Sequence, residues 1–378
     1  MAQNAVKDRL LNGIRVFMFA RVPILFSALG VLCALCGQSL AQEWKTIADG
    51  VEYAEVRREF SGKSVNINLL RLDLKKVRLD VHHAMDAAIG TEKTSSIATR
   101  HKAFAAINAG FFRLDTSIWA GEAAGLLKVD GKVWSESSKD RVAMIISNKL
   151  TETRVGMTQL NTYTALKVGK KESKVWGINR ELEEKDLVAF TPAFHTTTLT
   201  RSGVLEVIIA GGKVIRISDG GSSRIPTNGF VIAGTSGYHE SLRDMKVGTK
   251  VSLVTSLRRP ESDKLSDWDI INALVYYIGS EDIVAGVPQL IKNSRIDITW
   301  EQEKASKSFV ETRHPRTAVA KLKDGKFLML TADGRTEQSA GLDLYDLAAY
   351  FLELGATDAM NLDGGGSTTM FLDGKVVN

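Results

Sequence analysis

The sequence is poor in proline and confines its cysteines to the N-terminal segment. Its 378 residues include six prolines and two cysteines, Cys33 and Cys36. No low-complexity tract and no repeat period of roughly 20 to 50 residues is present, which argues against long disordered linkers, solenoids and propellers. If the N-terminal segment is removed on export, the remaining chain has no cysteine. Disulfides, thiol catalysis and cysteine-ligated metal are then excluded, and stability must come from a hydrophobic core.

The N-terminus has the three parts of a signal peptide. Four basic residues precede an uncharged stretch over 22–42, whose apolar core covers 22–36, and the small residues Ser39 and Ala41 follow. We therefore expect 1–41 to be a signal peptide and the protein to be secreted or periplasmic, with no stable membrane span after cleavage. The alternative is an uncleaved anchor, although the apolar core is shorter than the roughly 20 residues of a membrane-spanning helix.

The charge balance does not indicate a nucleic-acid partner. Residues 1–41 hold four basic residues and one acidic residue, so their removal lowers the net charge from +5 to +2. No basic stripe with interleaved aromatic residues remains. With 44% hydrophobic and 25% charged residues, the composition is that of a globular protein.

Glycine-containing turns between apolar runs predict many antiparallel strands. Two-residue turns of the Asp-Gly or Gly-Gly type are expected within 129–133, 209–214, 322–327 and 372–376. Further strands are expected at 71–81 and 251–257, and a helix at 94–102. The expected fold class is α+β: mixed, largely antiparallel sheets with a few packed helices in a single large domain. Within it, 42–94 form a strand-rich N-terminal portion and 95–378 the main domain.

The clearest helix signal covers 343–354 and leads into a glycine-rich loop. Apolar residues recur there at helical spacing, Asp343 is a suitable N-cap, and Gly355 is suited to end the helix. A strand at 356–362 is expected next, followed by three consecutive glycines at 364–366. Loops that follow a rigid strand often carry function.

The loop 361–369 is the first candidate site. Consecutive amide groups at Gly364, Gly365, Gly366 and Ser367 could cradle an anion, and alternation along the strand would place Asn361 and Asp363 on one face. The alternative is a purely structural turn.

Three other elements carry chemically useful side chains, each with a structural alternative. Asn108 ends an apolar strand at 103–107, or belongs to a simple turn. Arg316 is a candidate anion clamp because its planar fork matches phosphate oxygens, or it is a surface arginine. Asp333 is a second carboxylate, or a turn residue.

Taken together and in this order, these motifs resemble the phosphodiester glycosidase family. The resemblance covers about residues 95–378 and rests on the segments 108–112, 125–132, 225–229, 286–290, 315–318, 333–335 and 361–367. It implies hydrolysis of a sugar-1-phosphodiester, such as a GlcNAc-1-phosphodiester, at the anomeric C–O bond. Asp363 and Asp333 would be the catalytic carboxylates, with Glu122 a weaker candidate. The implied substrate-binding residues are Asn108, Arg316, Thr317, Arg335, Asn361, Gly364, Gly365, Gly366 and Ser367.

Two functions of other classes remain open at this point. A non-catalytic, exopolysaccharide-associated module would bind glycan without paired carboxylates. A phosphodiesterase that cuts P–O would normally need a metal cluster, and the six histidines show no ligand spacing except the adjacent pair His82-His83. We therefore expect no required cofactor, with an oxygen-liganded Ca²⁺ site still open. The expected partner is a glycan or sugar phosphate, and the oligomeric state is not predicted.

Overall fold

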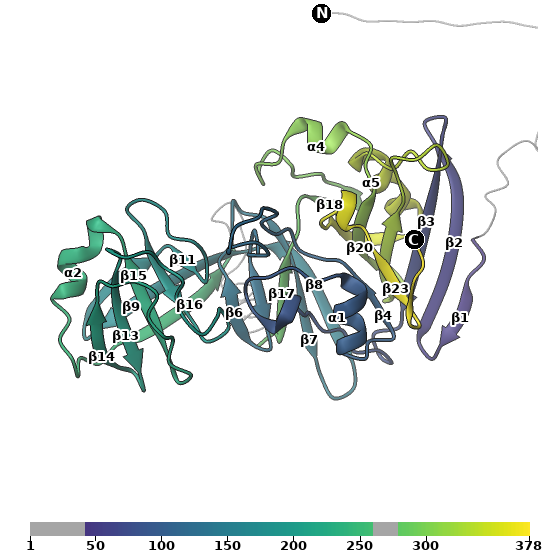
Figure 1. Cartoon of the computed structure of the whole chain (residues 1–378). Coiled ribbons are helices and arrows are strands. Elements are labelled where there is room, and N and C mark those ends of the chain that lie inside the picture. Colours follow the sequence, from purple (N-terminus) through teal and green to yellow (C-terminus); the bar gives the residue numbers. More distant parts are fainter. Residues whose placement is uncertain (1–41, 260–278) are drawn as a thin grey trace, which may run out of the picture. The chain divides into compact units, whose positions relative to one another are not determined.

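The largest element of the fold is an eight-stranded antiparallel sheet (Figure 1). The structure is a computed structural model that describes residues 42–259 and 279–378, so the predicted signal peptide lies outside the described residues. In spatial order the strands are β1 (Lys45–Ala48), β2 (Val51–Phe60), β3 (Lys63–Leu72), β21 (Phe327–Ala332), β20 (Arg316–Leu322), β22 (Ala356–Asn361), β18 (Gln289–Lys292) and β19 (Arg295–Ile296).

This sheet joins the N-terminal strands to the C-terminal part of the chain. Leu70 of β3 lies opposite Met329 of β21 in the ladder. Residues 44–378 form one compact unit. The strand expected at 71–81 was misplaced, because the strand ends at Leu72.

One face of the eight-stranded sheet is covered by α5 (Leu344–Glu353), as the sequence predicted. Asp343 caps the helix by accepting a hydrogen bond of 2.8 Å from the amide of Asp346. Leu347 and Phe351 are fully buried against this face of the sheet. Gly355 adopts φ +85° after the helix and leads directly into β22. The short helix α4 (Lys307–Glu311) contacts α5.

The opposite face packs on a second antiparallel sheet. Its strands, in spatial order, are β6 (Lys132–Ser135), β5 (Leu127–Val129), β17 (Asp282–Ala285), β7 (Val142–Asn148) and β8 (Thr153–Gln159). Leu70 and Val319 of the large sheet share one core with Val142 and Met144 of this sheet. The large sheet is therefore buried on both faces and provides a rigid support.

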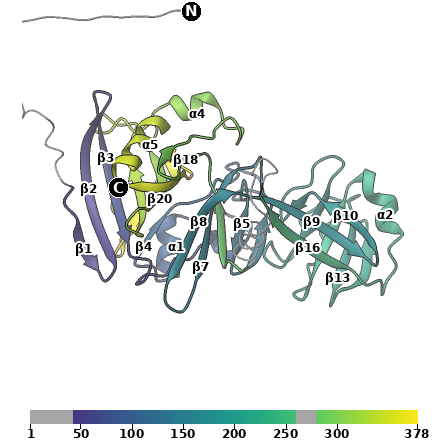
Figure 2. The same ribbon diagram turned by 180° about the vertical axis from the view of Figure 1, so that it is seen from behind.

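Two further sheets enclose a separate core. One contains β10 (Lys171–Val175), β9 (Asn161–Val168) and β16 (Ser252–Arg258). The other contains β11 (Gly177–Ile178), β12 (Leu187–Phe190), β15 (Gly229–Gly234), β13 (Leu205–Ala210) and β14 (Lys213–Ser218). Leu166, Leu187 and Val207 pack together between them. Beside this region lie η2 (Ser236–Tyr238) and α2 (His239–Arg243), as Figure 2 shows for α2.

A small third element places the candidate site. The strands β24 (Lys375–Val376), β23 (Met370–Leu372) and β4 (Ala105–Ile107) form a three-stranded sheet. Ile107 lies opposite Met370, which brings Asn108 beside the loop that follows β22. Before β4 come η1 (Ala84–Asp86) and α1 (Thr94–Arg100), and η3 (Gly365–Ser367) lies in the loop itself.

The antiparallel sheets and the few helices confirm the larger part of the predicted architecture. The class is mostly β rather than α+β, because strands far outnumber helices among the described residues. No helix in the described part of the chain is both long and apolar enough to cross a membrane.

Candidate functional site

The predicted motifs meet at one end of the eight-stranded sheet. The amide of Asp363 donates to the carbonyl of Ala109 at 2.9 Å, and the amide of Gly365 donates to the carbonyl of Pro315 at the same distance. The loop after β22 is thus fixed to the end of β4 on one side and to the start of β20 on the other. Segments that are more than 200 residues apart in the sequence form one small region.

Asp363 is a half-buried carboxylate at the centre of this region. One carboxylate oxygen accepts a hydrogen bond of 2.9 Å from the amide of Gly364, and the hydroxyl of Ser367 also donates to the carboxylate. Burial nevertheless raises the pKa of Asp363, because these two donors only partly offset the loss of water. A carboxyl whose pKa is raised by burial is a candidate for proton transfer in catalysis.

Asp333 lies at the end of β21 and is linked to the same loop through Asn378. The side-chain amide of Asn378 donates to the Asp333 carboxylate at 3.4 Å and to the Thr368 carbonyl at 3.2 Å. Burial raises the pKa of Asp333, and the negative charge of Glu55 on β2 raises it further. The structure thus links both predicted carboxylates to the glycine-rich loop, Asp363 within it and Asp333 through Asn378. It also places the charge of Glu55, on a distant N-terminal strand, near Asp333, which the sequence did not indicate.

Arg335 supplies an exposed positive charge next to the glycine run. A Cβ atom built on Gly365 would lie 3.3 Å from its guanidinium Nη2, so the guanidinium lies directly against that glycine. The same Nη2 is 3.1 Å from Nδ1 of His314. Burial and the charges of Arg316 and Arg335 lower the pKa of His314, which favours a neutral ring that accepts the arginine proton. Sequence reasoning missed His314 as a site residue, although it directly precedes the Pro315-Arg316 motif.

Arg316 has a different environment from the one expected of an anion clamp. Its side chain is fully buried and donates to three backbone carbonyls, those of Leu342 at 2.9 Å and of Phe309 and Thr312 at 2.8 Å each. Burial lowers the pKa of the guanidinium to about 10. Two of its three nitrogens are therefore committed to holding α4 and Leu342, which precedes the N-cap of α5, against β20. The exposed cation of the site is Arg335.

The glycine run is shaped by close packing and left-handed backbone geometry. A Cβ atom on Gly364 would lie 2.7 Å from the carbonyl oxygen of Pro315, and Gly365 adopts φ +60°. The amides of Gly365 and Ser367 donate to backbone carbonyls, and that of Gly364 donates to the adjoining carboxylate. The expected cradle of free amides is therefore not the arrangement in the structure. Gly366 is the exposed member of the run.

Asn108 and Thr317 connect the strands beneath the site. The Asn108 side chain donates to the Asp363 carbonyl at 2.7 Å and accepts hydrogen bonds from the Thr317 hydroxyl at 2.6 Å and the Thr369 amide at 3.1 Å. Thr317 is fully buried. Both residues lie in the predicted place, but their polar groups position Asp363 and do not face open space.

Asn361 is also internal. It is fully buried, and its side-chain amide donates to the carbonyls of Val287 and Leu362 at 2.8 Å each. Asn361 therefore fixes the loop that precedes β18. Strand alternation had predicted that Asn361 and Asp363 lie on the same face. Their environments differ, because the strand ends at Asn361 and Asp363 belongs to the following loop.

Two buried hydroxyl groups near these residues have no hydrogen-bond partner among the described residues. They are Oγ1 of Thr331, at the end of β21, and Oγ1 of Thr368, in the glycine-rich loop. Thr331 lies opposite Thr317 in one ladder and opposite Asn68 in the next. Buried polar groups without partners are uncommon in folded proteins.

Other chemically interesting groups lie outside this constellation. Glu122, the weaker catalytic candidate, accepts a hydrogen bond of 3.3 Å from the amide of Glu181 and lies 3.9 Å from Arg113. Burial raises its pKa. No contact described in the structure connects Glu122 with Asp363 or Asp333. The pair His82-His83 lies beside η1, which precedes α1 in the chain.

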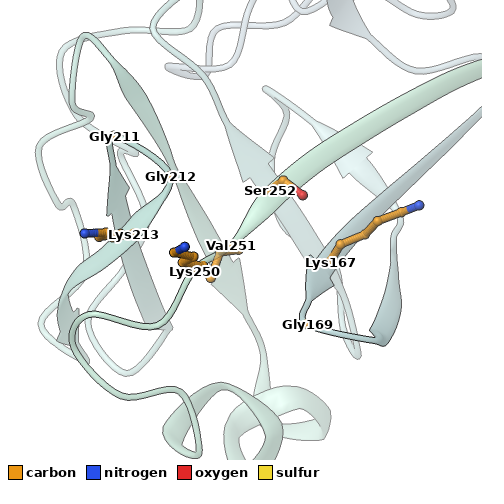
Figure 3. Close-up of a pocket in the computed structure, with 8 residues that line it drawn as sticks. All are labelled: Lys167, Gly169, Gly211, Gly212, Lys213, Lys250, Val251 and Ser252. Carbon is orange, nitrogen blue, oxygen red and sulfur yellow. The ribbon is translucent and has the colours of Figure 1, made fainter.

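A pocket of about 340 Å³ lies in the separate two-sheet region and has different chemistry. It is lined by glycines and three lysines at the tips of two hairpins. In Figure 3, Lys167 points away from Lys213 and Lys250, so the three charges do not converge on one point. The described lining of this pocket contains no carboxylate, so its chemistry differs from that of the site around Asp363. Among the described residues, the candidate site also holds no group of three His, Cys, Asp or Glu side chains that converge as metal ligands.

The part of the chain that carries Asp333, Arg335 and Asp363 is similar to a known protein family. Residues 203–378 match the family model described as phosphodiester glycosidase. The predicted resemblance to the phosphodiester glycosidase family is thereby confirmed for this part of the chain.

Curated proteins are similar to this chain over part of its length. N-acetylglucosamine-1-phosphodiester alpha-N-acetylglucosaminidase of Mus musculus is 33% identical over 124 residues, which are 30% of this chain and 23% of that protein. The Homo sapiens protein of the same name is 36% identical over 106 residues, covering 25% and 20%. The chain thus spans less than a quarter of the length of these relatives.

Two solved structures show the same fold. A hypothetical protein from Synechocystis aligns with a TM-score of 0.75 at 20% identity, over 89% of this chain and 60% of that one. A putative exported protein from Burkholderia pseudomallei aligns with a TM-score of 0.71 at 22% identity, over 83% and 70%. At these identities the likeness supports the fold alone.

Proposed function

We propose that the chain is an exported hydrolase that cleaves sugar-1-phosphodiesters at the anomeric C–O bond. Its substrates would be of the GlcNAc-1-phosphodiester type, in cell-envelope or extracellular glycans. The family match over 203–378 supports this reaction class, and the names of the mouse and human relatives support the choice of substrate.

The observation that carries the proposal is the proximity of opposite charges around Gly365. The Asp363 carboxylate lies two residues away in the same loop, and the Arg335 guanidinium lies against the glycine itself. Cleavage of C1–O builds positive charge on the sugar ring and negative charge on the departing phosphate. Fixed groups of both signs, arranged before the reaction, stabilise such a charge separation.

The reaction assigns a role to each group. The C1–O bond breaks, and its electron pair leaves with the phosphomonoester, which Arg335 stabilises together with the exposed Gly366 segment. Asp363 faces C1, where a carboxylate stabilises the ring cation or accepts the proton of the attacking water. The water oxygen forms the new bond to C1. Asp333 serves as the second carboxylate on the other side of the loop.

Hydrolysis of a GlcNAc-1-phosphodiester in ¹⁸O water tests the proposal. We expect the label in the released sugar and loss of turnover in Asp363→Asn. Label in the phosphate would instead identify a phosphodiesterase, and saturable polysaccharide binding without hydrolysis would identify a binding module. Export is tested by N-terminal sequencing of the secreted protein, which we expect to begin near Gln42.

A further inference from the structure

A cluster of metal-binding side chains lies where the chain passes from β3 to α1. His82, Asp86 and His101 each present one ligand atom, and these atoms all lie within 4.8 Å of one another. The imidazole rings of His82 and His101 stack with centroids 3.5 Å apart and planes 12° from parallel. None of these residues takes part in the candidate hydrolase site.

The backbone around Asp86 is held in an unusual conformation. Met85 and Asp86 both adopt left-handed φ angles, of 55° and 51°, although neither is glycine. The amide of Met85 donates to the carboxylate of Glu92 at 2.9 Å, which fixes this turn. Consecutive left-handed non-glycine residues are unfavourable and persist where the surroundings enforce them. Here the turn directs Asp86 toward His101.

The contacts of His101 cannot all be satisfied at once. Its Nε2 lies 2.9 Å from the Asp86 carboxylate and 2.9 Å from Nη1 of Arg100. An imidazole nitrogen carries either a proton or a lone pair, so it can serve the acceptor or the donor but not both. Arg100 also donates to Asp86 and, at 2.9 Å, to Glu92. Nη1 of Arg100 thus lies between the Asp86 carboxylate and the His101 imidazole.

We propose that His82, Asp86 and His101 form a binding site for a divalent transition metal, with Zn²⁺ the best match. Two imidazoles and one carboxylate suit Zn²⁺ better than Ca²⁺ or Mg²⁺, which prefer oxygen ligands. A metal ion between Asp86 and His101 satisfies the carboxylate and the Nε2 lone pair together. Three protein ligands leave one position of a tetrahedral site open to water.

Arg100 acts as the competing cation in this arrangement. When the ion enters, its guanidinium leaves Asp86 and keeps its ion pair with Glu92. The exposed His82 ring turns out of the stack, because two parallel rings cannot both direct a lone pair at one ion. The bound metal then links η1 to the end of α1 and stabilises the fold by mass action.

Titration of the untagged, full chain with ZnCl₂ tests the site, with calorimetry and the melting temperature as readouts. We expect saturable binding near one equivalent and a rise in melting temperature, with the d–d spectrum of Co²⁺ reporting tetrahedral coordination. His101→Ala should weaken binding at least tenfold and abolish the thermal shift. His82→Ala should also weaken Zn²⁺ binding severalfold. Because the His82 ring is exposed, this variant still tests the site if His101→Ala fails to fold.

The competitor and a matched histidine complete the test. Arg100→Gln should bind Zn²⁺ severalfold more tightly than the wild type, whereas His195→Ala, which removes an exposed histidine elsewhere, should bind like the wild type. The proposal is overturned if the wild type binds no more tightly than His82→Ala, or if Arg100→Gln leaves the affinity unchanged or weaker. Neither result bears on the proposed glycosidase reaction, because the two sites share no residue.

Discussion

The two arginines of the candidate site should fail in different ways when each is replaced by lysine. Lysine keeps the positive charge but loses the planar, multi-donor fork of arginine. Arg316 uses that fork to hold three backbone carbonyls in the interior. Arg335 is exposed, and its described hydrogen-bond partner is the ring of His314. The same substitution therefore tests a structural role at Arg316 and a substrate role at Arg335.

For Arg316→Lys the structure gives a magnitude for the loss of stability. The single ammonium group of lysine cannot reach the carbonyls of Leu342, Phe309 and Thr312 at once. One or two of these buried acceptors therefore lose their hydrogen-bond donor. Each such loss costs about 1–3 kcal/mol, so we expect the free energy of unfolding to fall by about 2–4 kcal/mol. In a unit of this size the melting temperature should decrease by about 3–6 °C.

For Arg335→Lys the expected loss is in turnover. A paired donor to a phosphate oxygen contributes about 1.5–3 kcal/mol, and a loss of about 1.4 kcal/mol is tenfold in rate. We expect kcat/KM for a GlcNAc-1-phosphodiester to fall tenfold or more, with the melting temperature nearly unchanged. The reasoning is refuted if Arg335→Lys keeps wild-type turnover while Arg316→Lys stays as stable as the wild type and loses turnover. In that case Arg316 is the anion clamp.

Three further outcomes follow from the carboxylates. Asp363→Asn keeps the shape of the side chain and removes its charge, so turnover should fall at least about a hundredfold while substrate still binds; Asp333→Asn in the same assay reverses the assignment if it alone abolishes turnover. Glu55→Gln removes a negative charge that raises the pKa of Asp333, so the limb of the pH–rate profile due to Asp333 should move to lower pH; an unmoved limb would exclude this coupling. Burial raises the pKa of Asp282 to about 6, so its contribution to the free energy of unfolding is present below about pH 4 and is lost as the pH rises through about 6; chemical denaturation across this range should show a loss of up to about 3 kcal/mol in the wild type that Asp282→Asn lacks.

Local sequence signals were sufficient to predict those helices and turns whose conformation depends on neighbouring residues in the chain. The helix at 344–353 was predicted from its apolar spacing, its N-cap Asp343 and the glycine after it, and each of these acts within one turn of chain. The turns at Asp130-Gly131 and Asp373-Gly374 adopt positive φ at both residues, as their composition predicted. The turn after β20 differs: it has four residues, and its positive φ is at Gly325.

The misplaced strand at 71–81 shows that burial of apolar residues does not by itself make a strand. Leu79 and Val81 are buried in the core beneath the eight-stranded sheet, although the strand has already ended at Leu72. Alternation reports which side chains face the core, whereas a strand also needs a partner for its backbone groups. That partner is set by long-range pairing. In this chain β21 pairs with residues 67–72, and the chain leaves the sheet afterwards.

The same distinction explains why the predicted motifs meet in the structure while several of their side chains have contacts that differ from those expected. The glycines at 364–366 indicated that the backbone bends here and approaches another segment. In the structure, Gly364 does lie close to Pro315. Which amides and cations remain available there depends on residues far away in the sequence: Leu342 engages Arg316, and Val287 engages Asn361. With those groups committed to the interior, an incoming phosphate would meet the exposed guanidinium of Arg335. The guanidinium of Arg335 can lie against Gly365 because glycine has no side chain. A side chain at residue 365 would lie between the guanidinium and the loop that carries Asp363.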